Sequence, residues 1–117
     1  MTIKLPIKLL SEANLREHWS AKHRRKKEQQ RIVLLFRQKL LMARPEGEPL
    51  TVHLTRIGPR CLDLDNLAGC FKHSQDAIAL VLGVDDGDRK RVHWTYNWRK
   101  GKPKEYALEV AFEGPGG

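Results

Sequence analysis

The clearest structural signal in the chain lies in the segment Cys61-Leu-Asp-Leu-Asp-Asn-Leu-Ala-Gly-Cys-Phe-Lys-His-Ser-Gln-Asp76. Apolar side chains recur in it at helical spacing and continue to Leu82, where Gly83 supplies a helix stop. An aspartate at position 63 or 65 can cap the beginning of this helix. We therefore expect one helix from these aspartates to about Leu82, with an apolar stripe that packs on a sheet and consists of Leu67, Phe71, Ile78 and Leu82.

Sequence patterns typical of strands lie on both sides of this helix, and a pattern typical of a second helix precedes it. Apolar residues alternate over 2–9, 50–55, 92–98 and 106–112, which indicates strands, and a long polar helix is expected after Ser11. The last two strands flank the basic segment Arg99–Lys104 and are predicted to form a hairpin. The expected fold is a small mixed α/β (α+β) domain over residues 1–113, in the order β-α-β-α-β-β, with a frayed tail at 114–117.

The chain of 117 residues carries a net charge of +8, from 22 lysines and arginines against 14 aspartates and glutamates. This excess favours a polyanionic partner, and nucleic acid is the first candidate, with a basic protein that is merely soluble as the alternative. The apolar fraction of 40% fits a soluble globular protein, and no run is long enough to cross a bilayer. We therefore expect no membrane partner.

The two cysteines, Cys61 and Cys70, lack the second pair that a zinc site would need, and nothing suggests secretion. The first ten residues carry lysines and a proline through their apolar run, so they indicate a strand and not a signal peptide. We expect a cytoplasmic protein in which both cysteines are packing residues.

Acidic residues gather at two places in this otherwise basic chain. Asp63 and Asp65 are two residues apart on an extended lead-in, so both carboxylates can point to one side, and Asp86 lies in the turn after the helix. Carboxylates that lie close together repel one another unless a cation sits among them, and a hard divalent metal is the usual one. We expect Asp63, Asp65 and Asp86 to bind Mg²⁺, with Mn²⁺ able to substitute. Asp85 is expected to support either the turn or the metal-binding aspartates.

The Asp-x-Asp pair has commoner roles than metal binding, of which helix capping and turn formation are the most frequent. An EF-hand is excluded, because it would need an oxygen ligand at Leu67 and a glycine at Ala68. A nucleotide-sugar transferase would need a longer chain. Lys72 falls on the same helix face as Asp65 and can reach back toward the carboxylates. Asp76 lies one turn further on and is expected to hold Lys72 or an arginine in place.

The basic residues fall into three groups that could contact phosphates without reading bases. They crowd the first long helix, the turn before the third strand, and the segment between the last two strands. The expected DNA contacts are Lys22, Arg24, Arg25, Lys26, Lys27, Arg31, Arg89, Lys90, Arg91, Lys100 and Lys102. In the third strand, Trp94, Tyr96 and Trp98 alternate with polar residues, which favours a role in the core or a dimer interface over base stacking.

Taken together, Leu62-Asp-Leu-Asp-Asn-Leu67, a helix carrying a lysine and Asp76-Ala77, and Leu82-Gly-Val-Asp-Asp-Gly-Asp88 resemble the RusA family of Holliday junction resolvases, above all its phage and prophage versions. The resemblance covers most of the chain and is most specific over residues 62–88. It implies a homodimeric, magnesium-dependent endodeoxyribonuclease of the bacterial cytoplasm that nicks four-way DNA junctions symmetrically.

Carried over by position, the resemblance makes Asp63 and Asp65 the paired metal aspartates and Asp86 the third. Lys72 matches the catalytic lysine, but it lies about one helical turn further from Asp-Asn than in much of the family. Two rival hypotheses are a non-catalytic phage DNA-binding protein on the same scaffold and a less selective nuclease acting on forks or flaps.

Overall fold

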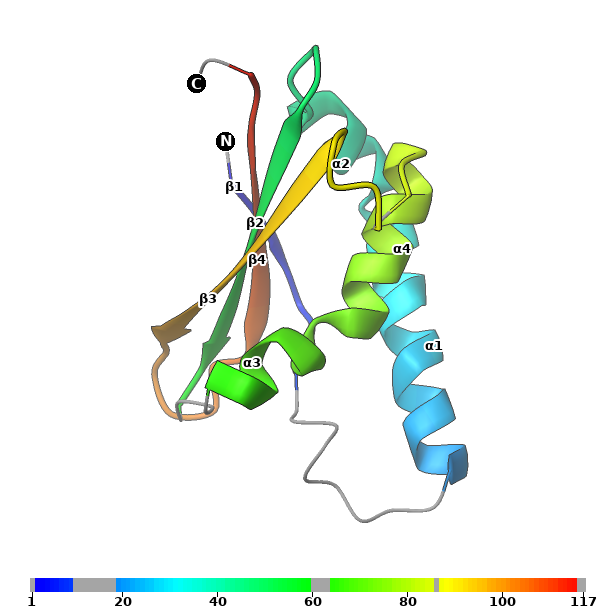
Figure 1. Cartoon of the computed structure of the whole chain (residues 1–117). Helices are drawn as coiled ribbons and strands as arrows, with labels where there is room; N and C mark the ends of the chain where they lie inside the picture. The colour runs from blue at the N-terminus through cyan, green and yellow to red at the C-terminus, as the bar shows by residue number, and fades with distance from the viewer. Residues whose placement is uncertain (1, 10–18, 60–63, 86, 116–117) are drawn as a thin grey trace.

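A computed structural model describes residues 2–9, 19–59, 64–85 and 87–115, although the side chains of residues 19 and 64–66 are not among those described (Figure 1). Strands and helices follow one another in the predicted order, but each of the two predicted helices is divided in two. The elements are β1 (Thr2–Leu5), α1 (Trp19–Leu35), α2 (Arg37–Ala43), β2 (Leu50–Gly58), α3 (Leu64–Cys70), α4 (Lys72–Leu82), β3 (Val92–Lys100) and β4 (Ala107–Glu113).

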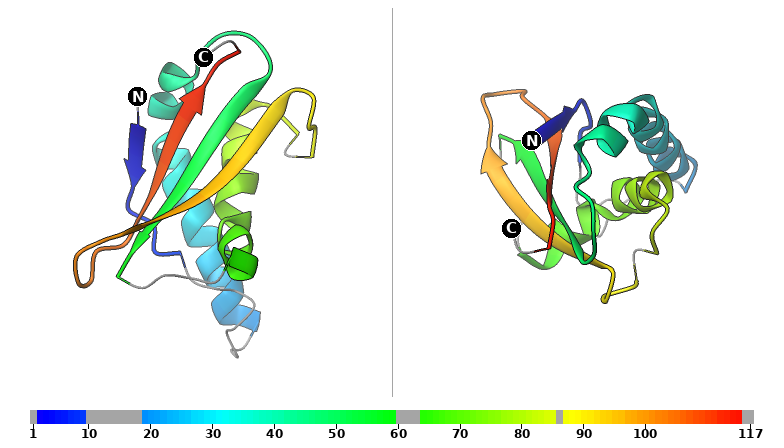
Figure 2. Two further views of the ribbon diagram at one scale, coloured as in Figure 1. Left: turned by 60° about the vertical axis from the view of Figure 1, so that its left-hand side comes forward. Right: turned by 90° about the horizontal axis from the view of Figure 1, so that it is seen from above.

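The strands form one mixed sheet of four, in the order β1-β4-β2-β3. β4 runs antiparallel to both β1 and β2, whereas β3 runs parallel to β2. The helices lie together on one face of this sheet, so the described chain has two layers (Figures 1 and 2). A small mixed α/β domain is therefore confirmed. None of the described helices has the length and apolar character needed to cross a membrane.

The predicted hairpin between β3 and β4 is wrong, because these strands lie on opposite sides of β2. Ile57 faces Arg99 of β3 on one side and Ala107 of β4 on the other. The connection between the strands crosses the end of β2, where the Gly101 N–H donates to the Gly58 carbonyl at 2.9 Å. This arrangement pairs both edges of the most buried strand, which satisfies its backbone groups in the centre of the sheet.

β2 alternates between the two faces of the sheet. Val52 and Leu54 point into the core and are fully buried. Between them, His53 contacts Thr95 and Glu113 through its two ring nitrogens, at 2.7 and 3.1 Å, on the face without helices. The sheet is therefore apolar toward the helices and polar toward the other side, as the alternation predicts.

The predicted single helix from the aspartates to Leu82 is two helices that meet at Phe71. The Phe71 N–H donates to the Ala68 carbonyl three residues back, at 3.2 Å, which tightens the last turn of α3. The Phe71 ring is fully buried and stacks on Tyr96 of β3 with 5.5 Å between ring centroids. The chain changes direction between α3 and α4 at this residue, where the Phe71 ring packs against the sheet. α4 ends at Gly83, whose φ of 71° confirms the predicted helix stop.

The apolar stripe of this helix pair is confirmed, because Leu67, Phe71, Ile78 and Leu82 are all buried. Cys70 is also buried, as expected of a packing residue, and its thiol donates to the Leu67 carbonyl at 2.9 Å. Cys61 lies outside the described residues. In the first helical segment Ile32 and Leu40 are buried. α1 ends at Leu35 and α2 begins again at Arg37, so Leu35 faces solvent with 66% of its surface exposed.

We predict that Phe71→Ala lowers the free energy of unfolding by about 3–5 kcal/mol, because it empties a fully buried site at the junction of α3, α4 and β3. The matched control is Leu80→Ala on α4, where the side chain is 77% exposed and the expected change is within about 0.5 kcal/mol. Urea unfolding followed by circular dichroism measures both. Equal losses in the two variants would show that Phe71 does not organise this junction.

Candidate functional site

The structure describes only part of the predicted acidic site. Asp63 and Asp86 lie outside the described residues, and Asp65 is described only as backbone in the first turn of α3. Among the side chains that are described, no group of three or more His, Cys, Asp or Glu residues is arranged to hold a metal ion. The metal site built on Asp63, Asp65 and Asp86 stays a prediction.

The described residues next to these aspartates lie at opposite ends of the sheet (Figure 1). Leu64 begins α3 after the carboxyl end of β2, whereas Asp85 and Gly87 precede Val92, which faces Leu50 at the beginning of β2. α4 has 11 residues, and at about 1.5 Å per residue it separates the two segments by about 16 Å. A single metal site that draws on both segments of one subunit must therefore bridge about the length of α4.

The acidic turn after α4 is held by its own aspartates. Asp85 Oδ1 accepts a hydrogen bond from the Gly87 N–H at 2.9 Å, and Asp88 Oδ1 accepts one from the Lys90 N–H at 3.1 Å. The Asp88 N–H in turn donates to the Asp85 carbonyl at 3.0 Å. Both carboxylates thus make hydrogen bonds within the turn, as expected of Asp85, and each has a second oxygen that these bonds do not use. A role of Asp85 in supporting the metal ligands stays a prediction.

Lys72 is the first residue of α4, on the side of α3. Its Nζ lies 3.8 Å from Asp76 Oδ2, one helical turn further on, which is the pairing that the spacing of four predicts. The Lys72 side chain is 70% exposed, so this ion pair adds little stability. A cation at the amino end of a helix also opposes the helix dipole. Helix stability therefore does not explain a lysine at this position.

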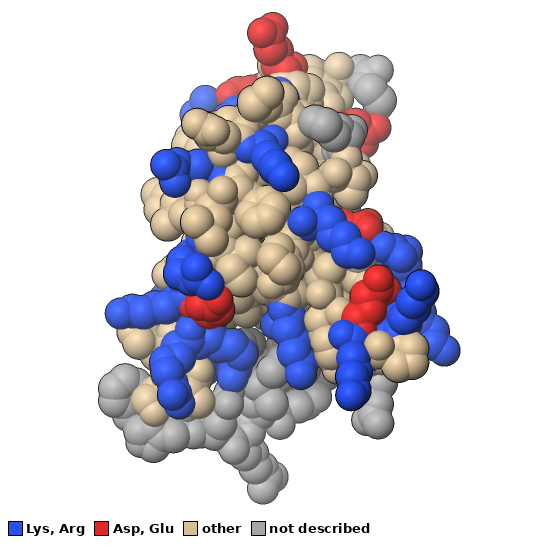
Figure 3. Space-filling view, turned by 180° about the vertical axis from the view of Figure 1, so that it is seen from behind, with Lys and Arg blue, Asp and Glu red and all other residues tan. Residues whose placement is uncertain are grey.

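The first basic group lies on the exposed surface of the amino-terminal half of α1. Lys22, Arg24, Lys26 and Lys27 are exposed and Arg25 is half-buried. Figure 3 shows lysine and arginine side chains concentrated in one half of the face it draws, toward the beginning of α1 on one side and the β3–β4 connection on the other. This half of the molecule is also the end at which α3 begins (Figure 1).

Arg31, on the next turns of α1, is held by an acidic partner. Glu28 accepts two hydrogen bonds from the Arg31 guanidinium, at 2.6 and 3.1 Å. These bonds lower the pKa of Glu28 and raise the pKa of Arg31. Part of the Arg31 charge is therefore neutralised by its own helix, unlike that of Lys26 and Lys27, which have no ion pair in the described part of the chain.

The second basic group precedes β3, where Arg89, Lys90 and Arg91 are exposed. Arg91 donates two hydrogen bonds to Glu48 Oε1, at 3.0 and 2.8 Å, which lower the pKa of that carboxyl and raise the pKa of Arg91. The third group lies at the other end of the sheet, where Lys100 is exposed at the end of β3 and Lys102 on the β3–β4 connection.

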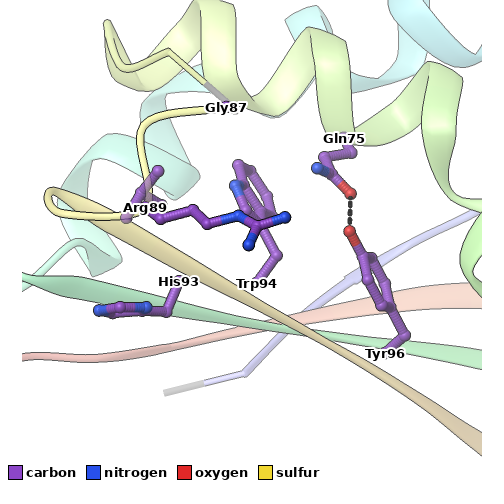
Figure 4. A pocket seen from close by; sticks show the side chains of 7 residues that line it. Gln75, Gly87, Arg89, His93, Trp94 and Tyr96 are labelled. Atoms are coloured by element: carbon purple, nitrogen blue, oxygen red, sulfur yellow. Dashed lines mark hydrogen bonds between the residues drawn. The ribbon is translucent and has the colours of Figure 1, made fainter.

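A pocket of about 570 Å³ between α4 and the edge strand β3 is a feature that the sequence did not reveal (Figure 4). Tyr96 Oη donates to Gln75 Oε1 at 2.6 Å and ties the two walls together. The alternation of aromatic residues in β3 shows that their rings share one face of the strand. The sequence does not show which helix packs opposite these rings, so the pocket could not be predicted. The lining residues are Gln75, Gly87, Arg89, Val92, His93, Trp94 and Tyr96.

Comparisons of the chain with protein-family models, with curated proteins and with solved structures find no match in any of the three.

We predict that the double variant Lys26→Gln/Lys27→Gln reduces the slope of log K against log salt for duplex DNA binding by about 1.8, because each phosphate contact contributes about 0.9. The charge-matched control is Arg31→Gln/Arg91→Gln, which removes cations already paired with Glu28 and Glu48. Fluorescence anisotropy between about 50 and 200 mM salt measures the slope. The control should change it by less than half as much, and identical changes would contradict a specific contact surface on α1.

Proposed function

We propose that the protein is a magnesium-dependent, structure-specific endodeoxyribonuclease that resolves four-way DNA junctions by paired symmetric nicks, as the resemblance to the RusA family implies. The observation that carries the proposal is where α3 begins. Asp63 and Asp65 flank the first residue of α3, and this end of the molecule also carries the basic half of α1 and the β3–β4 connection (Figures 1 and 3). Basic surfaces on both sides attract a phosphate backbone toward the acidic pair.

The donor set fits a hard divalent cation, since it consists of carboxylate oxygens alone. When bound there, Mg²⁺ would supply an activated water and neutralise charge on the leaving oxygen. Asp63, Asp65 and Asp86 are the residues proposed to hold it. Lys72, at the amino end of α4, is proposed to stabilise negative charge on the scissile phosphate, which accounts for a cation at a position where the helix gains nothing from it.

The length of α4 separates the segment next to Asp86 from the segment that begins α3. Because the neighbours of Asp86 and those of Asp63 and Asp65 lie at opposite ends of one subunit, we propose that Asp86 serves the site of the partner subunit in a twofold homodimer. Such a dimer carries two equivalent sites. A four-way junction has two opposed strands to nick, so two sites related by a twofold axis match the symmetry of the substrate.

We predict that Asp65→Asn lowers the rate of junction cleavage by at least about 100-fold while junction binding stays intact, because the neutral amide lacks the negative charge with which a carboxylate binds Mg²⁺. The control is Glu46→Gln, which removes an exposed acid from the loop between α2 and β2. A labelled four-way junction is incubated with Mg²⁺ or with chelator, beside fork and linear duplex DNA.

Wild-type activity in Asp65→Asn, or cleavage in chelator, would overturn the metal mechanism. Binding without cleavage by the wild type would favour the non-catalytic DNA-binding protein. Equal cleavage of forks and junctions would favour the less selective nuclease.

A second prediction concerns the shared site. Asp65→Asn and Asp86→Asn are each expected to be inactive, but co-refolded together they should regain about a quarter of wild-type cleavage. Half of the mixed dimers are heterodimers, and in each of these one site has both substitutions and the other has neither. Native mass spectrometry confirms the exchange of subunits. An inactive mixture with demonstrated exchange would place all three aspartates in the site of one subunit.

A further inference from the structure

The pocket between α4 and β3 is not used by the proposed metal chemistry, although the acidic turn borders it through Gly87. Its volume of about 570 Å³ falls within the range of about 300–1,000 Å³ that is typical of small-ligand sites. β3 is an edge strand in the described sheet, and α4 forms the facing wall (Figure 4). The pocket therefore opens on a surface that an extended ligand could follow.

One wall of the pocket is aromatic and held in place. The Tyr96 ring stacks on the buried Phe71, and its hydroxyl donates to Gln75, so this ring has little freedom to move. Trp94 is half-buried, and its Nε1 is enclosed without a hydrogen-bond partner among the described residues. Since the nitrogen is enclosed, the part of Trp94 that meets the pocket is ring surface. This wall is suited to a flat, apolar group and not to a hydrogen-bonding edge.

The polar side of the pocket consists of donors. The Arg89 side chain extends from the turn before β3 toward the part of the pocket where Trp94 and Gln75 lie (Figure 4). No ion pair holds its guanidinium in the part of the chain that the structure describes. Gln75 uses its oxygen to accept from Tyr96, which leaves its amide N–H groups for another partner. The ligand that fits is therefore an anion that carries a flat, hydrogen-bond-accepting ring.

We propose that this pocket binds one unpaired nucleotide of a DNA strand, with the base against Trp94 and Tyr96 and its phosphate at Arg89. Stacking of bases on aromatic side chains is tolerant of sequence, and arginine contacts phosphates without reading bases. The neighbouring Lys90 and the net charge of +8 favour a polyanion over an uncharged ligand. The inference rests on the proposed action on DNA and adds to it a separate site for a nucleotide that becomes unpaired at a branch point.

The experiment compares three DNAs in chelator, so that cleavage plays no part. They are a short duplex, the same duplex with a single unpaired thymidine, and the same with an abasic residue in place of that thymidine. Fluorescence anisotropy gives each affinity. The wild type should bind the unpaired thymidine about 10-fold more tightly than the abasic residue, as expected for stacking of one base.

Trp94→Leu should reduce that preference to below about 2-fold, since the ring that stacks on the base is gone. Arg89→Gln should weaken binding of both bulged DNAs by about 5-fold more than binding of the plain duplex, because the phosphate contact exists only with an extruded nucleotide. Lys90→Gln, which removes the adjacent exposed cation outside the pocket, should weaken all three DNAs alike. Circular dichroism establishes that each variant is folded, and Arg89→Gln changes an exposed residue, so it tests the pocket even if Trp94→Leu does not fold.

A wild-type preference below about 2-fold for the thymidine over the abasic residue would overturn the nucleotide pocket, and so would equal effects of Arg89→Gln and Lys90→Gln. In either case duplex binding would persist, and the proposed nuclease function would stand. Failure of the wild type to bind even a labelled four-way junction under the same conditions would instead overturn both proposals.

Discussion

The parallel pairing of β2 with β3 is the constraint on which the rest of the arrangement depends. The two strands are in register over their whole length, from Leu50 opposite Val92 to Gly58 opposite Lys100. Because parallel neighbours begin at the same end of a sheet, the chain must return over its full length between them. α3 and α4 make this return, and the buried stripe that includes Phe71 and Ile78 fixes them to the sheet. The beginning of α3 and the acidic turn are thereby held at opposite ends.

The same pairing explains how charge and ring surface are distributed. At the carboxyl end of β2, the beginning of α3 lies with the basic half of α1 and the β3–β4 connection. Along the length of α4, the edge strand β3 faces the helix with its aromatic residues, and the pocket lies between them. The proposed metal chemistry and the proposed nucleotide site thus occupy different parts of one β-α-α-β unit. A substrate strand that contacts both would follow the surface of α4.

Local patterns predicted the elements well and their partners poorly. The stripe that contains Leu67 and Ile78 and the stop at Gly83 depend only on residues within a few turns of one another, and both are confirmed. The alternation in β3 and β4 identifies two strands but carries no information on which strand lies between them, so the predicted hairpin was wrong. The break at Phe71 was not predicted, because one long helix and two short ones share the same apolar stripe and only the contact with Tyr96 distinguishes them.

In the candidate site, too, contacts between residues close in sequence were predicted and contacts between distant residues were not. The ion pair between Lys72 and Asp76 is local and was predicted, whereas the partners of Arg91 and Tyr96, which are Glu48 and Gln75, are distant in sequence and were not. The pocket belongs to this second class, since its walls meet only after the β2–β3 pairing is made. The acidic site depends on the same long-range step, because nothing in the spacing of the aspartates shows which ends of the fold they occupy.

We propose that one divalent cation is bound jointly by the segment that begins α3 and by the turn after α4, which the fold separates within a subunit. Paramagnetic broadening of backbone amide signals by substoichiometric Mn²⁺ tests this directly, because it reports which segments lie near the ion. We expect the amide signals of Leu64 and Leu67 and those of Asp85 and Gly87 to broaden together, and Asp65→Asn to abolish both effects. Broadening confined to the turn, or none at either segment, would contradict it.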